Sequence, residues 1–221
     1  MKIPKKIIEK YKKEFDPELD LFLENFDEPE GSKILEIGAH DNPFALMLAE
    51  AGFIVHGIDL REYDQGEHEN YTHHVCNFLK LPTRFIKEHA GTFDAVVSIS
   101  ALEHFGLGTY SDTKYNPYAD VAATQNVYNL LKNDGYFSLS VPYGGRYVET
   151  RPHWKTYDFS ELYFRFGLNL QINSFSVRCV ENIKLLGCDF KPGDKVDNLA
   201  STFNLNGNPA LSIFVKFWKV P

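Results

Sequence analysis

Lys33-Ile34-Leu35-Glu36-Ile37-Gly38-Ala39-His40-Asp41-Asn42-Pro43 is the stretch of sequence that decides the fold. Its apolar first half is typical of a buried strand. Gly38 lets the chain turn sharply and lets a ligand approach the backbone, because glycine has no side chain. Asn42 is a good helix cap and Pro43 a good first helical residue. The stretch predicts a strand, a tight turn and a helix over 43–51.

The alternation of strand and helix continues along the chain. The further patterns follow in this order: helix at about 4–26, strands at 53–59 and 71–76, helix at 84–89, strand at 93–98, helix at 120–131, strand at 136–141 and helix at 160–166. Strands that alternate with helices at this spacing predict a parallel, doubly wound α/β sheet with right-handed crossovers. The last strand patterns, at 170–180 and 210–220, have no convincing helix between them. We expect these two to pair like a hairpin.

The composition is typical of a soluble, folded protein kept inside the cell. The 221 residues are 43% hydrophobic, enough for one sizeable core. No apolar run is long enough to span a bilayer and the first residues lead into no signal peptide, so we expect a cytoplasmic protein with no membrane partner. The three cysteines, an odd number without a close pair, are expected to be reduced thiols.

The charge balance bears on partners. The formal net charge of -7 argues against a nucleic acid, because a phosphate backbone favours a basic docking face. The basic stretch at 2–13 is a local exception, but its lysines interleave with apolar residues at helical spacing. This pattern predicts an amphipathic helix with a solvated face. The sequence carries no signal for an oligomeric state.

The turn at Gly38 resembles the first motif of the class I S-adenosylmethionine-dependent methyltransferases. That motif has an acidic residue followed by glycines at alternating positions. Glu36 and Gly38 match it, whereas His40 and Asn42 stand where the family has its second and third glycines. The resemblance implies a Rossmann-like sheet, mostly parallel and seven-stranded, with an antiparallel C-terminal strand.

Four further segments follow in the order of this family. Asp59 ends the second strand, where the resemblance implies that its carboxylate accepts both ribose hydroxyls of S-adenosylmethionine. Asn77 is similar to the family's adenine-contacting residue, with Phe78 beside the ring. The segment 93–104 looks like the fourth-strand motif and its trailing Leu-Glu-His, and 130–135 is similar to the Leu-Lys-Pro-Gly-Gly turn. An ordered set of this kind is more specific than any one member.

The resemblance covers roughly residues 33–166, the expected cofactor-binding core of a single domain over 1–221. Residues 1–31 are expected to form an N-terminal helical extension, and 167–221 the C-terminal strands. The cofactor site expected from the resemblance comprises Glu36, Gly38, Asp59, Asn77, Phe78 and Ser98. Each of these residues also has a structural interpretation when taken singly. Glu36 can cap neighbouring backbone, and Asn77 alone is more often a turn former than a ligand contact.

Two histidines are candidate general bases. Methyl transfer from a sulfonium is an in-line displacement in which positioning supplies much of the acceleration, and a hydroxyl nucleophile also benefits from a base. His104 opens a long glycine-containing loop that is a candidate lid, although a histidine here can also merely fix the loop by hydrogen bonding. His153 follows the fifth strand, where the family often carries a histidine. The sequence of the loop is similar to that of a little-characterised branch of methyltransferase-like proteins. That branch carries its own His and Tyr, which match His153 and Tyr157.

No metal site is predicted. His73, His74 and Cys76 are close in sequence, but on a strand His73 points opposite to the other two. No second cluster with zinc spacing accompanies them. Ser98 and Ser100 occupy the stretch where metal-dependent methyltransferases use an aspartate.

The methyl acceptor is expected to be a small molecule, with a hydroxyl favoured by the two candidate bases. A sugar or sugar nucleotide is suggested by the resemblance of the loop. Two other classes stay open. A nicotinamide-dependent oxidoreductase also needs a glycine-rich first turn, but no glycine follows Gly38 within five residues and His40 would crowd a diphosphate. A non-catalytic binding protein with the methyltransferase fold would account for the altered glycines.

Overall fold

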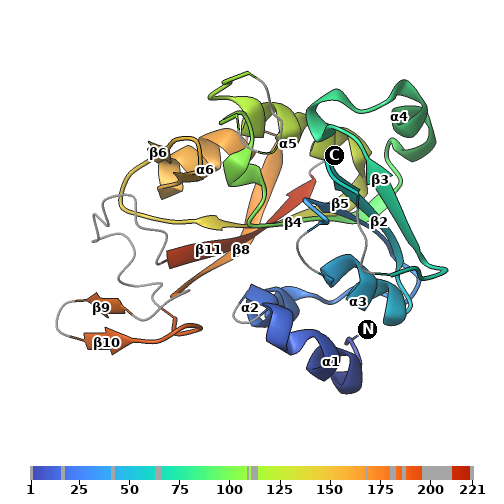
Figure 1. Ribbon diagram of the computed structural model, residues 1–221, viewed down its shortest axis with the longest axis horizontal. Coiled ribbons are helices and arrows are strands. Elements are labelled where there is room, and N and C mark those ends of the chain that lie inside the picture. The colour runs from blue at the N-terminus through green and yellow to red at the C-terminus, as the bar shows by residue number, and fades with distance from the viewer. Residues whose placement is uncertain are drawn as a thin grey trace.

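The structure is a computed structural model in which a twisted central sheet separates two layers of helices (Figure 1). It describes residues 2–15, 18–40, 43–62, 66–108, 110, 114–167, 169–179, 183–185, 188–195 and 211–219. Among these residues, no helix is both long enough and apolar enough to cross a membrane. The expected helix cap at Asn42 lies outside the described residues.

Seven strands form the central sheet in the order β3-β2-β1-β4-β5-β11-β8. Their bounds are β1 Lys33–Ile37, β2 Ile54–Asp59, β3 Tyr71–Val75, β4 Phe93–Ile99, β5 Leu131–Pro142, β8 Leu170–Cys179 and β11 Leu211–Lys219. The strands from β3 to β5 pair in parallel, and β11 is antiparallel to both of its neighbours. The predicted Rossmann-like architecture and the pairing of the last two long strands are confirmed.

Helices cover both faces of this sheet (Figure 1). One layer holds α1 Lys5–Phe15, α2 Glu18–Asn25 and α3 Phe44–Glu50, and the other holds α4 Thr83–His89, α5 Ala119–Leu130 and α6 Phe159–Phe166. Each layer has its own apolar core. Phe22 of α2 meets Phe44 of α3 edge to face at 4.5 Å on one side, while Val127, Phe137 and Phe166 belong to the buried cluster on the other. Burial of these faces is what holds the layers to the sheet.

The sheet reverses its strand order at β1. From β1 the chain moves outward to β2 and β3, and then returns to the other side of β1 as β4 and β5. The loops that leave the carboxyl ends of β1 and β4 therefore diverge, which opens a crevice between them. Gly38 begins the loop after β1, and its amide donates to the carbonyl of Ile58 over 2.8 Å.

Several elements differ from those expected. The helical region at 4–26 is two helices, and β5 begins at Leu131 rather than 136, because the chain pairs with β4 as soon as α5 ends. Two short hairpins were not predicted: β6 Val148–Thr150 with β7 Trp154–Thr156, and β9 Ile183–Leu185 with β10 Cys188–Phe190. Three-residue strands are too short to show a period in the sequence.

Candidate active site

A cavity lies at the carboxyl edge of the sheet, where the strand order reverses. It encloses about 730 Å³, with the open solvent at its mouth included. Five residues singled out by the sequence analysis line it: Gly38, Asp59, Asn77, Phe78 and His104. They follow four different strands, and parallel pairing brings the ends of those strands to one edge.

Gly38 leaves the cavity open at the turn after β1. Its φ angle is +87°, which favours glycine, and a Cβ atom built here would lie 2.5 Å from the Cβ of Ala101. Ala101 also lines the cavity. A larger residue at position 38 would therefore both strain the turn and push against the opposite wall.

Asp59 holds an arginine in this structure. Its Oδ1 accepts from the backbone amide and from Nε of Arg61, at 2.9 and 3.0 Å, and its Oδ2 lies 3.4 Å from a terminal nitrogen of the same guanidinium. The guanidinium stacks on the ring of Tyr110 at 4.6 Å from its centroid. Arg61 and Tyr110 line the cavity as well. A diol that binds Asp59 must share its carboxylate with Arg61 or displace the arginine side chain.

Asn77 and Phe78 form the wall beyond β3. The amide oxygen of Asn77 accepts from the backbone of Leu79 over 2.8 Å and so caps the short 3₁₀ helix η1, Phe78–Lys80. An amide oxygen has two lone pairs, so this cap leaves one for a ligand. Phe78 is buried, and its carbonyl accepts from Asn126 of α5 over 2.7 Å. The turn-forming role of Asn77 is thus present alongside its position in the cavity wall.

A backbone carbonyl oxygen fixes the orientation of the His104 ring. His104 ends the 3₁₀ helix η2, Leu102–His104, and its Nδ1 bonds the carbonyl oxygen of His153. A carbonyl oxygen can only accept, so Nδ1 carries the proton and Nε2 has the lone pair when the ring is neutral. Nε2 lies 3.9 Å from Oε1 of the buried Glu103. The ring of Tyr110 meets His104 edge to face at 5.5 Å.

Three expected site residues do not line the cavity. Glu36 and Ser98 are buried within β1 and β4. The side chain of His153 is exposed beside Trp154, and its contact with the site is through its carbonyl oxygen. Ser100, two residues beyond Ser98, lines the cavity instead, with a φ angle of +44° and its amide bonded to Ser140.

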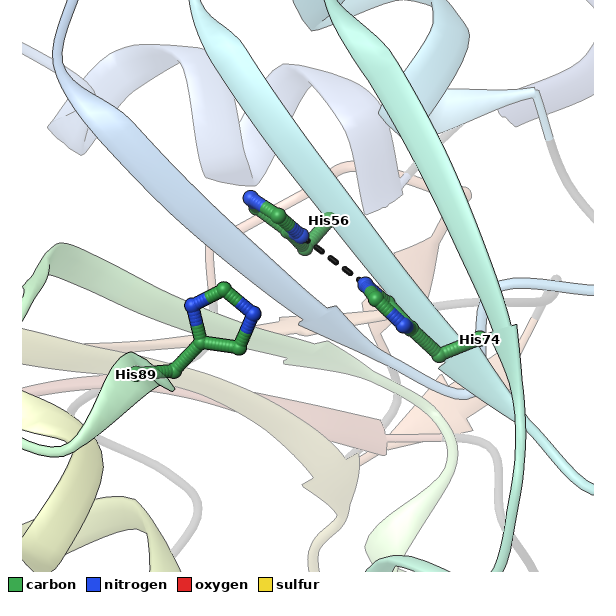
Figure 2. Close-up of side chains that lie close together, drawn as sticks. All are labelled: His56, His74 and His89. Atoms are coloured by element: carbon green, nitrogen blue, oxygen red, sulfur yellow. Dashed lines mark hydrogen bonds between the residues drawn. The ribbon is translucent and has the colours of Figure 1, made fainter. Parts of the chain in front are cut away.

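The histidines near β3 do not cluster as their sequence spacing suggests. His73 bonds Tyr71 and the carbonyl of Arg61, whereas His74 points the other way. Nε2 of His74 lies 2.9 Å from Nδ1 of His56, and His89 of α4 completes a group of three (Figure 2). The opposite orientation of His73 and His74 was predicted correctly, but the approach of His56 and His89 is visible only in the fold.

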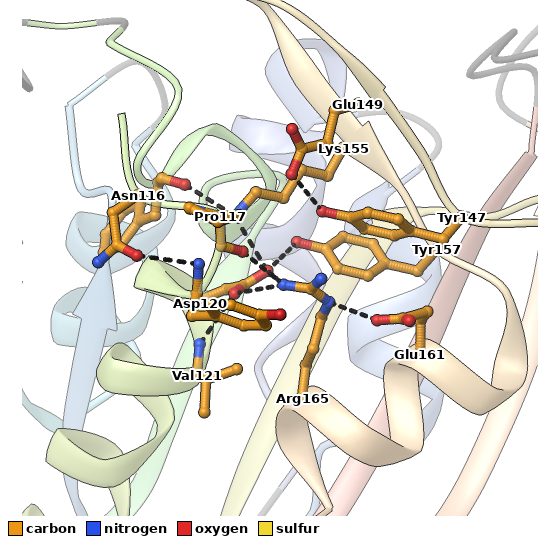
Figure 3. Close-up of polar contacts among 12 residues, drawn as sticks. Asn116, Pro117, Asp120, Val121, Tyr147, Glu149, Lys155, Tyr157, Glu161 and Arg165 are labelled. Atoms are coloured by element: carbon orange, nitrogen blue, oxygen red, sulfur yellow. Dashed lines mark hydrogen bonds and ion pairs between the residues drawn. The ribbon is translucent and has the colours of Figure 1, made fainter. Parts of the chain in front are cut away.

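A buried charge network supports the wall that carries Phe105. Asp120 accepts from Arg165, from Tyr157 at 2.9 Å, and from Lys155 at 3.1 Å (Figure 3). Lys155 also donates to the carbonyl of Phe105 over 2.8 Å. Burial, together with the Asp120 carboxylate, raises the pKa of Tyr157 well above its ordinary value, so the phenol stays a donor. Burial lowers the pKa of Lys155, although Asp120 opposes that shift.

The fold is that of an α/β protein with a cavity where the strand order of its sheet reverses. A family model described as a methyltransferase domain matches residues 7–168. The chain therefore belongs to this methyltransferase family. The predicted class, a class I S-adenosylmethionine-dependent methyltransferase, is confirmed. No match was found among curated protein sequences.

Solved structures share the fold at low sequence identity. A methyltransferase from Methanosarcina mazei is 16% identical, with a TM-score of 0.56 over 92% of this chain and 97% of its own. The 1,6-didemethyltoxoflavin-N1-methyltransferase of Burkholderia thailandensis, solved with 1,6-didemethyltoxoflavin and S-adenosylhomocysteine, is 17% identical, with a TM-score of 0.55 over 87% of this chain and 72% of its own. A Haloferax volcanii putative methyltransferase, in complex with the Trm112 activator, is 14% identical, with a TM-score of 0.57 over 98% and 93%.

Two residues that line the cavity, Arg61 and Ser100, were not predicted as site residues from the sequence. Both belong to loops, and neither carries a motif. Arg61 follows Asp59 by two residues, a spacing that by itself indicates no contact.

Proposed function

We propose that the protein transfers a methyl group from S-adenosylmethionine to a hydroxyl of a small molecule, with His104 as the general base. The observation that carries the proposal is the orientation of this ring. Because Nδ1 donates to the carbonyl of His153, Nε2 is the nitrogen that accepts a proton. His104 lines the same cavity as Gly38 and Asp59.

The residues around the cavity fit this cofactor. Gly38 leaves space where a side chain would close the turn, and the Asp59 carboxylate can accept hydrogen bonds from a ribose diol. Asn77 and Phe78 offer an amide and an aromatic face to an adenine. When bound, S-adenosylmethionine supplies an electrophilic methyl group carried on a sulfonium.

Glu36 and Ser98 are assigned a supporting place in this proposal. Each is buried in a strand beside a lining residue, Glu36 next to Ile37 and Ser98 two positions before Ser100. These two residues would then affect cofactor binding indirectly, because they hold the ends of β1 and β4 in place. His153 is likewise a positioning residue, because its backbone carbonyl fixes the tautomer of His104.

In this proposal the acceptor oxygen would bond the methyl carbon while the carbon–sulfur bond of S-adenosylmethionine breaks and S-adenosylhomocysteine leaves. The hydroxyl proton would move to Nε2 of His104. The ring becomes an imidazolium, and Glu103 lies close enough to stabilise that charge, at 3.9 Å from Nε2. The proton then leaves to solvent. General-base catalysis of this kind supplies a rate factor of about 10²–10⁴.

A small acceptor is supported by the walls around His104. Phe105 and Tyr110 line the cavity on this side, and aromatic walls suit a small organic substrate or the face of a sugar ring. The Burkholderia methyltransferase, which shares the fold, holds a small molecule. A sugar or sugar nucleotide is the acceptor class that the loop resemblance favours.

Calorimetry tests the cofactor half of the proposal. We expect S-adenosylhomocysteine to bind the purified protein, and Asp59→Ala to weaken it at least about tenfold, as expected for a lost charge-assisted contact. Glu67→Ala, at an exposed position, is the matched control. Absence of binding to the wild type, or equal affinity of Asp59→Ala and Glu67→Ala, would refute the site.

Turnover tests the acceptor half. Sugars, sugar nucleotides, phenols and amines are incubated with S-adenosylmethionine, and formation of S-adenosylhomocysteine is measured. We expect His104→Gln to lower kcat about 100-fold while it leaves cofactor binding unchanged. If His104→Gln turns over as fast as the wild type, or if only amines are methylated, the hydroxyl acceptor and its base are wrong.

A further inference from the structure

Three histidines from three different elements converge outside the cavity. His56 lies on β2, His74 on β3 and His89 at the end of α4. Each offers one ring nitrogen, and the three nitrogens all lie within 4.8 Å of one another (Figure 2). The chain has eight histidines, so more than a third of them meet at one place.

We propose that His56, His74 and His89 bind a divalent transition-metal ion of the zinc type, at a site distinct from the cofactor cavity. Neutral imidazole is the ligand that such ions share, and three protein nitrogens with one water complete a tetrahedral shell. No metal site is predicted from the sequence, because these three histidines are distant from one another along the chain. The convergence of β2, β3 and α4 supplies the ligand set that the sequence spacing lacks.

The distances suit a site that closes around an ion with small side-chain movements. Nδ1 of His56 lies 2.9 Å from Nε2 of His74, and the two ring planes differ by only 13°. The two rings thus meet nearly edge to edge. One of the two facing nitrogens carries a proton and donates it in a hydrogen bond to the other. Two nitrogens at about 2.05 Å from a tetrahedral zinc ion are about 3.4 Å apart. Insertion of the ion therefore requires these two rings to open by about 0.5 Å and turn toward it.

His89 presents its second nitrogen to this pair. Its Nδ1 lies 3.0 Å from Nζ of Lys33, and Figure 2 shows the other ring nitrogen facing His56 and His74. Lys33 also donates to Oγ1 of Thr92 over 3.1 Å. An ammonium only donates, so the ring nitrogen that faces the pair carries the proton in this arrangement. Metal binding requires the other tautomer, and Lys33 is then a competitor that must give up its contact with His89.

The surroundings favour neutral rings that an ion can still reach. The ring of Phe85 packs against His74 and His89, and that of Phe93 against His56. Burial, together with the nearby charge of Lys33, lowers the pKa of His56 to about 3, so the ring is neutral and one of its nitrogens has a lone pair at neutral pH. All three histidines stay partly exposed.

The group of three histidines is separate from the cofactor cavity, but β2 and β3 connect the two places. His56 precedes Asp59 by three residues on β2, and His74 precedes Asn77 by three, which is roughly 10 Å along a strand. An ion bound here would fasten α4 to the two outer strands of the sheet. It would thereby stabilise the side of the cavity formed by Asp59 and Asn77.

Zinc titration of the metal-free full-length protein tests this proposal. We expect one Zn²⁺ per chain in competition with a chromophoric chelator, and a rise of several degrees in the unfolding temperature at saturation. His74→Gln and His89→Gln should each weaken binding at least tenfold. His68→Gln, which changes a histidine outside the group, is the matched control and should bind as the wild type does.

Lys33→Gln sharpens the test. The glutamine amide oxygen can accept from Nδ1–H of His89, the contact that a metal-bound histidine usually makes, so we expect this variant to bind Zn²⁺ several-fold more tightly. The proposal is overturned if the folded wild type binds no Zn²⁺ at micromolar concentration, or if both ligand variants bind as tightly as His68→Gln. Binding to His104→Gln should be unchanged, which separates this site from the catalytic proposal.

Discussion

The cavity and the Asp120 network lie on either side of Phe105, and they use charged groups in opposite ways. In the cavity, Asp59 and Arg61 bond one another while remaining partly open to solvent, with side chains 9% and 33% exposed. In the network, Asp120 and Lys155 are fully buried and meet only protein. Charges that can exchange partners are suited to binding, whereas charges that cannot are suited to holding a wall in place.

The largest effect is expected on breaking the network. Asp120→Ala would leave the buried charges of Lys155 and Arg165 without their shared carboxylate, which should lower the free energy of unfolding by about 3–5 kcal/mol. Urea unfolding followed by circular dichroism measures the loss. Glu88→Ala removes a carboxylate from the exposed pair with Arg84 and should leave the midpoint where it was. An equal midpoint for the two variants would contradict the contrast between buried and open charges.

Gly38→Ala should disturb the cavity through its shape. The positive φ angle and the approach to Ala101 together should cost about 2–3 kcal/mol of stability, and binding of S-adenosylhomocysteine should fall more than tenfold. Gly31→Ala provides the control, because Gly31 has φ +80° with no atom within 4 Å of the added Cβ. The difference between the two variants isolates the contact with Ala101, and similar losses in both would rule that contact out.

Arg61→Met tests whether the open pair exchanges partners. With the guanidinium removed, residue 61 no longer competes with the ribose diol for the Asp59 carboxylate. S-adenosylhomocysteine should therefore bind about threefold to tenfold more tightly, while stability changes by less than about 1 kcal/mol. Isothermal titration measures the affinity, and Lys80→Met on the exposed side of η1 is a control. Weaker binding by Arg61→Met would show that the arginine belongs to the cofactor site.

The smallest effect concerns a helix cap beside the network. Asp158 caps α6 through Oδ1, which accepts from the amide of Glu161, and Oδ2 accepts from the amide of Tyr147. Although burial raises the pKa of Asp158, hydrogen bonds from Ser160 and these amides outweigh it, and the pKa is lowered. The cap therefore stabilises the fold above the unfolded pKa of about 3.9 and is lost as the pH falls through the lower folded value.

Asp158→Ala should accordingly cost about 1 kcal/mol at pH 7 and less at pH 3. Unfolding curves of the wild type and the variant at the two pH values give this difference. Asp158→Asn retains a capping oxygen without the titration and should show little dependence on pH. A difference between wild type and Asp158→Ala that grows toward low pH would reverse the assignment.

The sequence was sufficient where local pattern and strand direction decide the outcome. Gly38, Asp59 and Asn77 each follow a recognisable strand, and parallel pairing brings such positions to one edge. It was insufficient for the exact end of a strand, because Ser98 is still within β4, whereas Ser100, two positions further, lies beyond its end at Ile99 and lines the cavity. The sequence also could not reveal that His153 acts through its carbonyl, since every residue has one.

Contacts between segments that are distant along the chain could not be predicted from the sequence, for a different reason. Arg165 meets Asp120 across 45 positions, and His89 meets Lys33 across 56. No periodic pattern links such pairs, because their approach is set by how helices pack on the sheet. The three histidines became a group only once β2, β3 and α4 were placed.

The position of β11 also governs the order in which the sheet can assemble. This strand lies between β5 and β8, although it follows every other strand along the chain. While a ribosome is still adding residues 180–210, β8 has no partner in the sheet and the free edge of β5 is unprotected. The nascent chain must therefore pass through a stage in which an unpaired strand edge is exposed and can pair with other chains. Molecular chaperones shield surfaces of this kind.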